Sequence, residues 1–311
     1  MLTAIDVARE RADRAFPAPV TIFTGYYGSG KTEVALHAAT ALAGGPAPVT
    51  LIDLDFLKPV FRSRELRTVL EAQGVRLVAP GGELAAADLP IVMPSVGPLL
   101  RARTGQRTFV DLAGDAGGAR AIAQFAAVLE RLRAQAFHAC SAEGFAQAPA
   151  DPTSATACAQ DATPAASALA RNAVGVGAAS SSPRPAHPSP YDLLMVVNTL
   201  RPFASTVERI CNAARELSEV TRMPISGLVA NTNLGPLTTS EMVLSGCSTV
   251  CAAAAALNVP VRAVVVPEFL RDELSSDSFN DSCGCPLTSA GDELPILWLH
   301  RRVLLPWERA D

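Results

Sequence analysis

Short apolar runs alternate with segments of helix length along most of the chain. The runs lie at 20–24, 49–55, 75–80 and 108–114, and again at 191–199, 225–233, 261–267 and 295–300. Helical spacing of apolar positions predicts helices between them, at 31–43, 62–73, 119–136, 203–221 and 239–257. Nearly continuous apolar strands are typical of a parallel sheet covered on both faces. The pattern therefore predicts an α/β fold with a doubly wound, mostly parallel sheet flanked by helices.

The segment at 138–190 interrupts this alternation. It is rich in Ala, Ser, Pro and Gly, ends in ASSSPRPAHPSP, and has few large apolar side chains that could offset the entropy of ordering the chain. We therefore predict a low-complexity, disordered insertion. Because the strands before and after it are of one kind, residues 1–137 and 191–311 are expected to form the two parts of a single domain.

Composition and charge narrow the class of partner. The 311-residue chain is 49% hydrophobic and 18% charged, with a formal net charge of -4 and a pI of about 5.7. Such a chain can bury a large core, while its acidic balance disfavours a broad surface for nucleic acid or anionic lipid. We therefore expect a small molecule or a protein as the partner, and no nucleic acid.

The N-terminal segment 1–16 alternates charged and apolar residues, which predicts a short amphipathic helix and not the apolar core of a secretory signal. The run VCAAAAALNVPVRAVVV comes closest to a membrane span, but Asn258, Pro260 and Arg262 interrupt it. No stable membrane insertion is expected, and the predicted location is the cytoplasm.

The stretch TIFTGYYGSGKTEV joins a strand-like run to a helical pattern through a glycine-rich turn. It matches the phosphate-binding motif GxxxxGK[ST], in the strand-to-helix context that the motif requires, at Gly25, Tyr26, Tyr27, Gly28, Ser29, Gly30, Lys31 and Thr32. Backbone N–H groups of such a loop surround phosphate oxygens, and the positive end of the following helix adds to the attraction. Lys31 is expected to neutralise the β and γ phosphates of a nucleotide, and Thr32 to supply a hydroxyl ligand for Mg²⁺.

Hydrolysis also needs a carboxylate near the metal and a group that positions water. In FVDLAGDAGG, Asp111 ends an apolar strand, where its carboxylate can hold Mg²⁺ through water. Gly114 follows at the spacing at which a backbone N–H can sense a γ-phosphate. The alternative for Asp111 is an ordinary acid at a strand end. Asp115 either helps to place water or starts the turn before the next helix.

The stretch LIDLDFLKPVFRSRE places two carboxylates at the tip of the next strand. Asp53 and Asp55 share a face of that strand, and in a doubly wound sheet this tip faces the ligand crevice. Asp55 is the candidate for orienting the attacking water or for a contact around the metal, whereas Asp53 is expected to be structural. Arg62 and Arg64 either bind phosphate or an acidic partner, or form a solvated face.

These three motifs together resemble the CobQ/CobB/MinD/ParA nucleotide-binding superfamily, a branch of P-loop NTPases that includes ATP-dependent switch proteins, metal-cluster carriers and amidoligases. The resemblance covers most of the chain outside 138–190, and GYYGSGKTEV and DLDFLKPVFRSRE look most like bacterial ATP-binding proteins without an assigned substrate. It implies a P-loop NTPase fold and a base-reading role for Asn231 in GLVANTN, with Asn198 as a second candidate. The alternative for both is a turn-forming asparagine after a strand.

The chain departs from this superfamily at one position that matters for mechanism. Dimerising ATPases of the superfamily carry a second lysine in the pattern KGGxGK[ST], which reaches the nucleotide of the partner subunit. Here Tyr26 stands at that position, and Tyr27 replaces the next glycine. The trans-acting lysine mechanism therefore does not carry over, although a homodimer stays open. Arg62 or Arg64 is the candidate for a replacement cation.

The leading interpretation is a Mg²⁺-dependent ATPase that acts as a nucleotide-driven switch on a partner protein. The alternatives are an ATP-dependent ligase or kinase acting on a small metabolite, and a nucleotide-binding regulatory module with little turnover. ATP is favoured over GTP because NTNL and NTLR lack the lysine and aspartate of NKxD. Four cysteines either bind a metal, if the fold gathers them, or are small buried apolar residues: Cys247, Cys251, Cys283 and Cys285.

Overall fold

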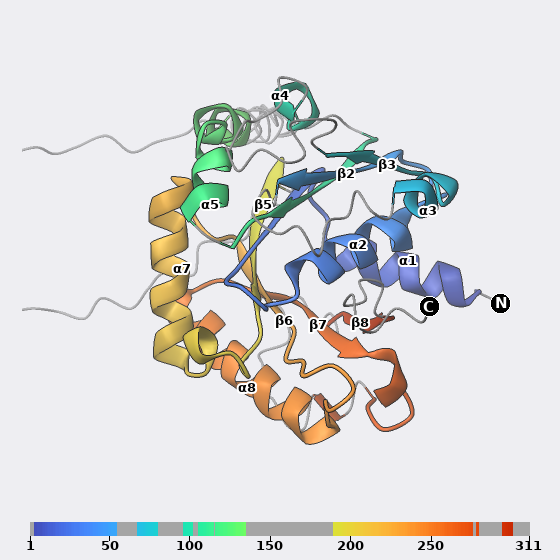
Figure 1. Cartoon of the computed structure of the whole chain (residues 1–311), viewed down its shortest axis with the longest axis vertical. Helices are drawn as coiled ribbons and strands as arrows, with labels where there is room; N and C mark the ends of the chain where they lie inside the picture. Colours follow the sequence, from blue (N-terminus) through green and yellow to red (C-terminus); the bar gives the residue numbers. More distant parts are fainter. Residues whose placement is uncertain are drawn as a thin grey trace, which may run out of the picture.

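The computed structural model describes residues 3–54, 67–79, 96–101, 105–114, 116–134, 189–275, 278–279 and 294–300. Its strands are β1 (Val20–Thr24), β2 (Val49–Leu54), β3 (Val75–Val78), β4 (Arg107–Leu112), β5 (Tyr191–Val197), β6 (Gly227–Ala230), β7 (Val261–Pro267) and β8 (Ile296–Leu299). They form one all-parallel, eight-stranded sheet in the order β3-β2-β4-β1-β5-β6-β7-β8 (Figure 1). The predicted α/β class with a parallel sheet is thus confirmed, and strands from both sides of segment 138–190 share the sheet.

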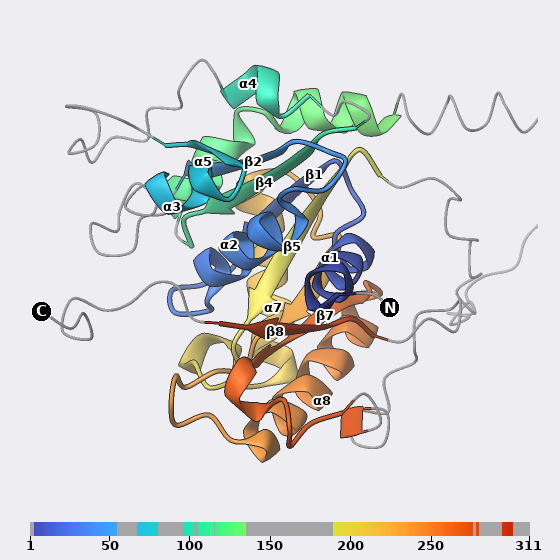
Figure 2. The ribbon, with the colours of Figure 1, turned by 90° about the vertical axis from the view of Figure 1, so that its right-hand side faces the viewer.

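Helices cover both faces of this sheet (Figures 1 and 2). On one face lie α1 (Ala4–Ala15), α2 (Lys31–Leu42) and α3 (Arg67–Ala72), and on the other lie α4 (Val96–Leu99), α5 (Ala116–Ala123), α7 (Val207–Thr221) and α8 (Ser240–Leu257). The strands alternate between the two cores: Phe23 and Phe109 pack on the α2 side, while Ile22 and Val110 pack on the other. Both faces of the central strands are therefore buried, which explains the nearly continuous apolar runs.

Strand β1 is the point at which the winding of the sheet changes direction. β4, β2 and β3 lie on one side of it, and β5 to β8 lie on the other. In open parallel sheets the ligand crevice lies beyond the carboxyl ends of the strands at such a point. The loops that follow β1, β4, β5 and β6 all leave this edge, so residues in these loops can act together.

Threonine side chains begin three helices. Thr3, Thr206 and Thr239 accept hydrogen bonds from backbone N–H groups in the first turns of α1, α7 and α8. The helix expected at 203–221 accordingly begins only after Thr206, behind a short 3₁₀ turn. α2 differs, because it follows Gly30, which has no side chain to cap the helix. The first N–H groups of α2 therefore lack a side-chain acceptor at the cap.

The segment at 119–136 is predicted as one helix, and the structure divides it. α5 is followed by a turn at 124–125, and helical residues resume at 126–134. The break coincides with an i→i+3 hydrogen bond from the backbone N–H of Phe125 to the Ile122 carbonyl, at 2.9 Å. Such 3₁₀ geometry tightens the backbone and shifts the register of the following turn. Apolar spacing does not reveal this break, because both pieces bury apolar residues against the same core.

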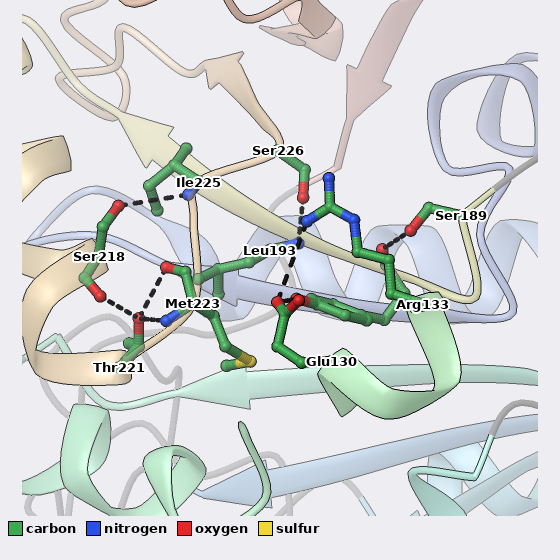
Figure 3. Close-up of polar contacts among 10 residues, drawn as sticks. Glu130, Arg133, Ser189, Leu193, Ser218, Thr221, Met223, Ile225 and Ser226 are labelled. Carbon is green, nitrogen blue, oxygen red and sulfur yellow. Dashed lines mark hydrogen bonds and ion pairs between the residues drawn. The ribbon is translucent and has the colours of Figure 1, made fainter. Parts of the chain in front are cut away.

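Polar contacts tie together the amino-terminal ends of β5 and β6 (Figure 3). The hydroxyl of Tyr191 donates to the Glu130 carboxylate, and the backbone N–H of Leu193 donates to the Ser226 hydroxyl over 3.1 Å. Burial, and then the contact with Glu130, raises the pKa of Tyr191 above its usual range. Helical residues 126–134 are thereby linked to the sheet by a side-chain pair at this edge.

Among the described helices, α8 alone is long and apolar enough by composition to cross a membrane. Its residues Val243, Cys247, Val250 and Ala254 are buried, and the helix packs on α7, β6 and β7. Core helices of globular proteins can have the same composition, because packing also selects apolar residues. The expected absence of membrane insertion stays a prediction.

Candidate functional site at the carboxyl edge of β1

Residues 25–30 connect the central strand β1 to α2 and are called the glycine-rich loop below. Gly25, Gly28 and Gly30 have φ angles of 140°, 76° and 85°, in the region that favours glycine. A Cβ on Gly30 would lie 2.2 Å from Asn231 Nδ2, and a Cβ on Gly25 would lie 2.5 Å from the Val196 carbonyl oxygen. The loop is therefore packed directly against β5 and the end of β6, and only glycine fits at these two positions.

Lys31 is the first residue of α2, and its side chain is buried, with only 2% of the residue exposed. Gly114, just beyond β4, lies beside it: a Cβ there would be 3.1 Å from Lys31 Nζ and 2.2 Å from the Gly25 carbonyl oxygen. The loop after β4 thus touches both the glycine-rich loop and the amine of Lys31. The structure brings together two residues, Lys31 and Gly114, that the sequence assigned to separate motifs.

Two buried carboxylates lie on neighbouring strands at the same edge. Asp53 of β2 and Asp111 of β4 are register partners, and Asp111 is also the partner of Phe23 in β1. Both aspartates are almost fully buried. Their strand neighbours Ile52 and Val110 point into the core on the other face of the sheet. Because successive side chains of a strand alternate between faces, both aspartates lie on the face that α2 covers. A buried ammonium group and two buried carboxylates at one edge are costly unless their charges compensate one another.

Two asparagines at the ends of β5 and β6 bind carbonyl groups of the glycine-rich loop. Asn231 Nδ2 donates to the Ser29 carbonyl over 2.7 Å, and Asn198 Nδ2 donates to the Gly28 carbonyl over 3.3 Å. The same amide nitrogen of Asn198 also donates to the Asn233 carbonyl over 2.8 Å. Both asparagines are buried, and the ends of β5 and β6 supply them. In the structure they brace the loop, while the base-reading role implied for Asn231 by the resemblance stays a prediction.

The two tyrosines of the loop have different surroundings. Tyr27 is 70% exposed. The hydroxyl of Tyr26 donates to Glu216 of α7 over 2.5 Å, and its ring centroid lies 5.5 Å from that of Phe203. Burial, and then the hydrogen bond to Glu216, raises the pKa of Tyr26 to about 12. The position at which the resembling dimerising ATPases carry a second lysine is therefore anchored to α7 and carries no cation.

Several predicted residues lie outside the described part of the chain: Asp55, Arg62, Arg64, Asp115, Cys283 and Cys285. Their roles stay predictions. Thr32 is described and is half-buried in the first turn of α2. The sulfur atoms of Cys247 and Cys251 are 4.0 Å apart within α8, where both residues are buried. Over the described ranges, no group of three or more His, Cys, Asp or Glu side chains could hold a metal ion.

Two residues around the loop escaped sequence reasoning. Arg201 donates its Nε to the Gly28 carbonyl over 3.3 Å. Arg201 lies three positions after Asn198 in VVNTLRP. Its position just beyond the end of a predicted strand was the one sequence feature that could have identified it as a site residue. Thr24, the last residue of β1, could not be identified as a site residue from the sequence, because threonine is common in buried strands.

The buried side-chain oxygens at this edge that have no hydrogen-bond partner within the described residues include Thr24 Oγ1, Ser29 Oγ and Asn231 Oδ1. Buried polar atoms in native proteins nearly always have partners, so each exception needs an explanation, such as a bound water or ion or a catalytic role. The uncapped start of α2, the amine of Lys31 and the hydroxyls of Thr24 and Ser29 can donate to an anion, whereas Asn231 Oδ1 can only accept a hydrogen bond. The Thr32 hydroxyl and the Asp111 carboxylate are hard oxygen ligands of the kind that Mg²⁺ prefers.

Comparisons with known proteins do not assign a family. No protein-family model matches the chain, and no curated protein matches it. The resemblance to the CobQ/CobB/MinD/ParA superfamily therefore stays a hypothesis that rests on the sequence motifs. The P-loop type of fold has the same standing, whereas the parallel α/β sheet and the local geometry of the glycine-rich loop are structural observations.

Proposed function

We propose that this protein binds Mg²⁺–ATP at the glycine-rich loop, hydrolyses it, and acts as a nucleotide-driven switch on a partner protein. One observation carries the proposal: at the switch point of a parallel sheet, glycines with positive φ lead into a helix without a side-chain cap, and its first residue is the buried Lys31. Such a loop presents backbone N–H groups and a helix dipole to phosphate. Membership of the CobQ/CobB/MinD/ParA superfamily is part of this proposal.

The side chains of this edge would divide the work. Lys31 neutralises the β and γ phosphates, while backbone N–H groups of the loop hold their oxygens. Thr32 and Asp111 would hold Mg²⁺, which when bound offsets phosphate charge. Gly114, beside the Lys31 amine, would lose a contact when the γ-phosphate leaves, and its loop would then relax. Asp55 keeps its predicted role in orienting the attacking water.

The surface around the loop supports the partner half of the proposal. Tyr27, Leu200, Phe203, Leu234 and Leu237 are exposed and belong to the loops that follow β1, β5 and β6. Contiguous patches of exposed apolar side chains are typical of surfaces that bind another protein, and these loops supply such side chains beside the proposed site. Their loops also supply the contacts that brace the glycine-rich loop. A change in that loop would therefore alter the surface that a partner meets.

A second candidate is favoured by one observation. The Tyr26 hydroxyl is bound to Glu216, so the loop position that supplies an extra lysine in the resembling ATPases contributes no charge to the phosphates. Charge stabilisation in the transition state is the main source of catalysis in phosphoryl transfer. A nucleotide-binding regulatory module with little turnover would share the site and differ only in the rate of hydrolysis.

The test combines thermal stabilisation of the full chain by nucleotides with phosphate release, both with and without Mg²⁺. ATP at about a hundred times its Kd should stabilise the parent by about 2.7 kcal/mol through mass action. Lys31→Ala should weaken ATP binding roughly a hundredfold, the value of about two charge-assisted hydrogen bonds. Because Lys31 is buried, its substitution can itself change the melting temperature. The quantity compared between parent and variant is therefore the increase in melting temperature when nucleotide is added.

Each outcome of this test selects an interpretation. Mg²⁺-dependent stabilisation with phosphate release supports the ATPase switch. Stabilisation without phosphate release, even with cell extract present, selects the regulatory module. A parent that no nucleotide stabilises, or a Lys31→Ala variant that responds like the parent, would refute nucleotide binding at this loop.

A further inference from the structure

We propose that Arg201, in the loop between β5 and α7, is the second cation of the nucleotide site and contacts the phosphates from the β5 side of the glycine-rich loop. The inference rests on the proposed function, since it names a further residue of that site. The sequence offered only Arg62 and Arg64 for this role, and both lie outside the described residues.

The position of Arg201 is defined by the loop itself. Its Nε donates to the Gly28 carbonyl over 3.3 Å, and a Cβ on Gly28 would lie 2.9 Å from the same nitrogen. Any larger residue at Gly28 would therefore displace the guanidinium. The backbone of Arg201 is also held, because its N–H donates to the Asn198 carbonyl over 3.1 Å. Asn198 in turn braces Gly28, so arginine and loop share one support.

The guanidinium of Arg201 retains unused donors. It carries five N–H groups, and its described hydrogen bond uses only the one on Nε. Arg201 is exposed, and none of the ion pairs within the described ranges involves it. Nearby Arg209 differs, because it donates to the Pro202 carbonyl over 2.6 Å and to the Ser205 hydroxyl over 3.0 Å. Arg201 is thus a cation beside the loop whose forked end is available to an anion.

Charge balance at the site gives this arginine a role. A triphosphate brings several negative charges to a loop whose own cation is Lys31, and Tyr26 supplies none. Arginine matches phosphate oxygens with two parallel N–H donors and stays charged at any physiological pH. A guanidinium already hydrogen-bonded to Gly28 loses less rotational freedom on binding phosphate than an unbound one would. Arg201 therefore adds affinity for the polyphosphate from within the same chain.

The experiment measures the Kd of Mg²⁺–ATP and the melting temperature without nucleotide for the full chain and three variants. Arg201→Ala should weaken ATP binding roughly ten- to hundredfold, as expected for a hydrogen bond to a charged group. Arg201→Lys should recover part of the loss, because it keeps the charge and loses the fork. Arg209→Ala is the matched control: it removes an exposed arginine from the same segment without touching the glycine-rich loop, and should bind ATP as the parent does.

The outcomes separate a phosphate contact from a structural brace. Weaker ATP binding in Arg201→Ala, partial rescue by lysine and an unchanged melting temperature without nucleotide support the inference. Unchanged affinity in Arg201→Ala overturns it. Equal losses in Arg201→Ala and Arg201→Lys, together with a lowered melting temperature, also overturn it, because they indicate that the arginine only supports the loop. A parent that binds no nucleotide would refute the proposed function itself, and the inference with it.

Discussion

Buried polar side chains have different surroundings at the two ends of the parallel strands, called the amino-terminal and the carboxyl-terminal edge of the sheet. At the amino-terminal edge, the Asp192 carboxylate accepts two hydrogen bonds from Arg262, at 3.0 and 3.2 Å, and is almost fully buried. The pair joins β5 to β7 across the intervening β6, although Nε of Arg262 has no hydrogen-bond partner among the described residues. At the carboxyl-terminal edge, the buried oxygens without a hydrogen bond among the described residues include those of Thr24, Ser29 and Asn231.

From this difference we infer that the polar contacts of the amino-terminal edge stabilise the fold, whereas those of the carboxyl-terminal edge serve ligand binding. Arg107, at the start of β4, adds to the first edge by donating to the carbonyl oxygens of residues 16–18. An unsatisfied buried polar group costs about 1–3 kcal/mol, so several around one loop reduce stability unless a ligand supplies partners. Thr21 Oγ1 within β1 and Nε of Arg262 at the amino-terminal edge are exceptions, because both are buried without a hydrogen-bond partner away from the loop. The clustering of the other oxygens named above still points to the glycine-rich loop.

The largest effect is expected from breaking the ion pair at the amino-terminal edge. Arg262→Met should lower the free energy of unfolding by about 3–5 kcal/mol, because it removes the cation from a buried carboxylate. Urea unfolding measures the loss. ATP affinity of the folded fraction should stay within about twofold of the parent, since the pair is remote from the glycine-rich loop. Adding Asp192→Asn to this variant should restore part of the stability; a loss of ATP affinity with intact stability would contradict the division between the edges.

Most strands were predictable from the sequence because the sheet is buried on both faces. The run at 20–24 coincides with β1, and Val261–Pro267 was likewise expected as a strand. Period and composition suffice where every side chain of a strand meets a core. The glycine-rich loop was equally visible, since its glycines and Lys31 are adjacent in the chain.

The contacts that complete the site were not predictable from the sequence. Asn198 and Gly28 are 170 positions apart, and Tyr26 and Glu216 are 190 apart. Asn198 meets Gly28 because β5 lies beside β1, and Tyr26 meets Glu216 because α7 packs on one face of these strands. No local sequence pattern encodes this arrangement of strands and helix. The role of Arg201 depends on the same packing. Motifs therefore predicted the loop, while the side chains that brace it became evident only from the fold.

A pair of serines compares the two edges at a smaller scale. Ser226→Ala should cost about 1–2 kcal/mol of unfolding free energy, because the buried N–H of Leu193 loses its hydroxyl acceptor. Ser29→Ala should instead raise the free energy of unfolding by about 1 kcal/mol, because it removes a buried hydroxyl that has no hydrogen-bond partner in the described structure. Both are read from chemical unfolding without nucleotide. Equal losses would show that the Ser29 hydroxyl is satisfied in solution, and the contrast between the edges would weaken.

The smallest effect on stability is expected at Tyr26. Its hydrogen bond to Glu216, at the glycine-rich loop, corresponds to the Tyr191–Glu130 pair at the amino-terminal edge. Tyr26→Phe should cost less than about 1 kcal/mol near neutral pH, because the hydrogen bond to Glu216 is exposed. The pKa of Tyr26 is raised from 10.0 to about 12, so between these values the unfolded chain releases the phenol proton while the folded chain keeps it. The parent should therefore lose stability relative to Tyr26→Phe as the pH rises from 10 to 12. Unfolding of both proteins across this range measures the difference, in which the titration of Tyr191 cancels. A difference that does not change with pH would mean that Tyr26 is not held by Glu216, and that the loop is free of its anchor on α7.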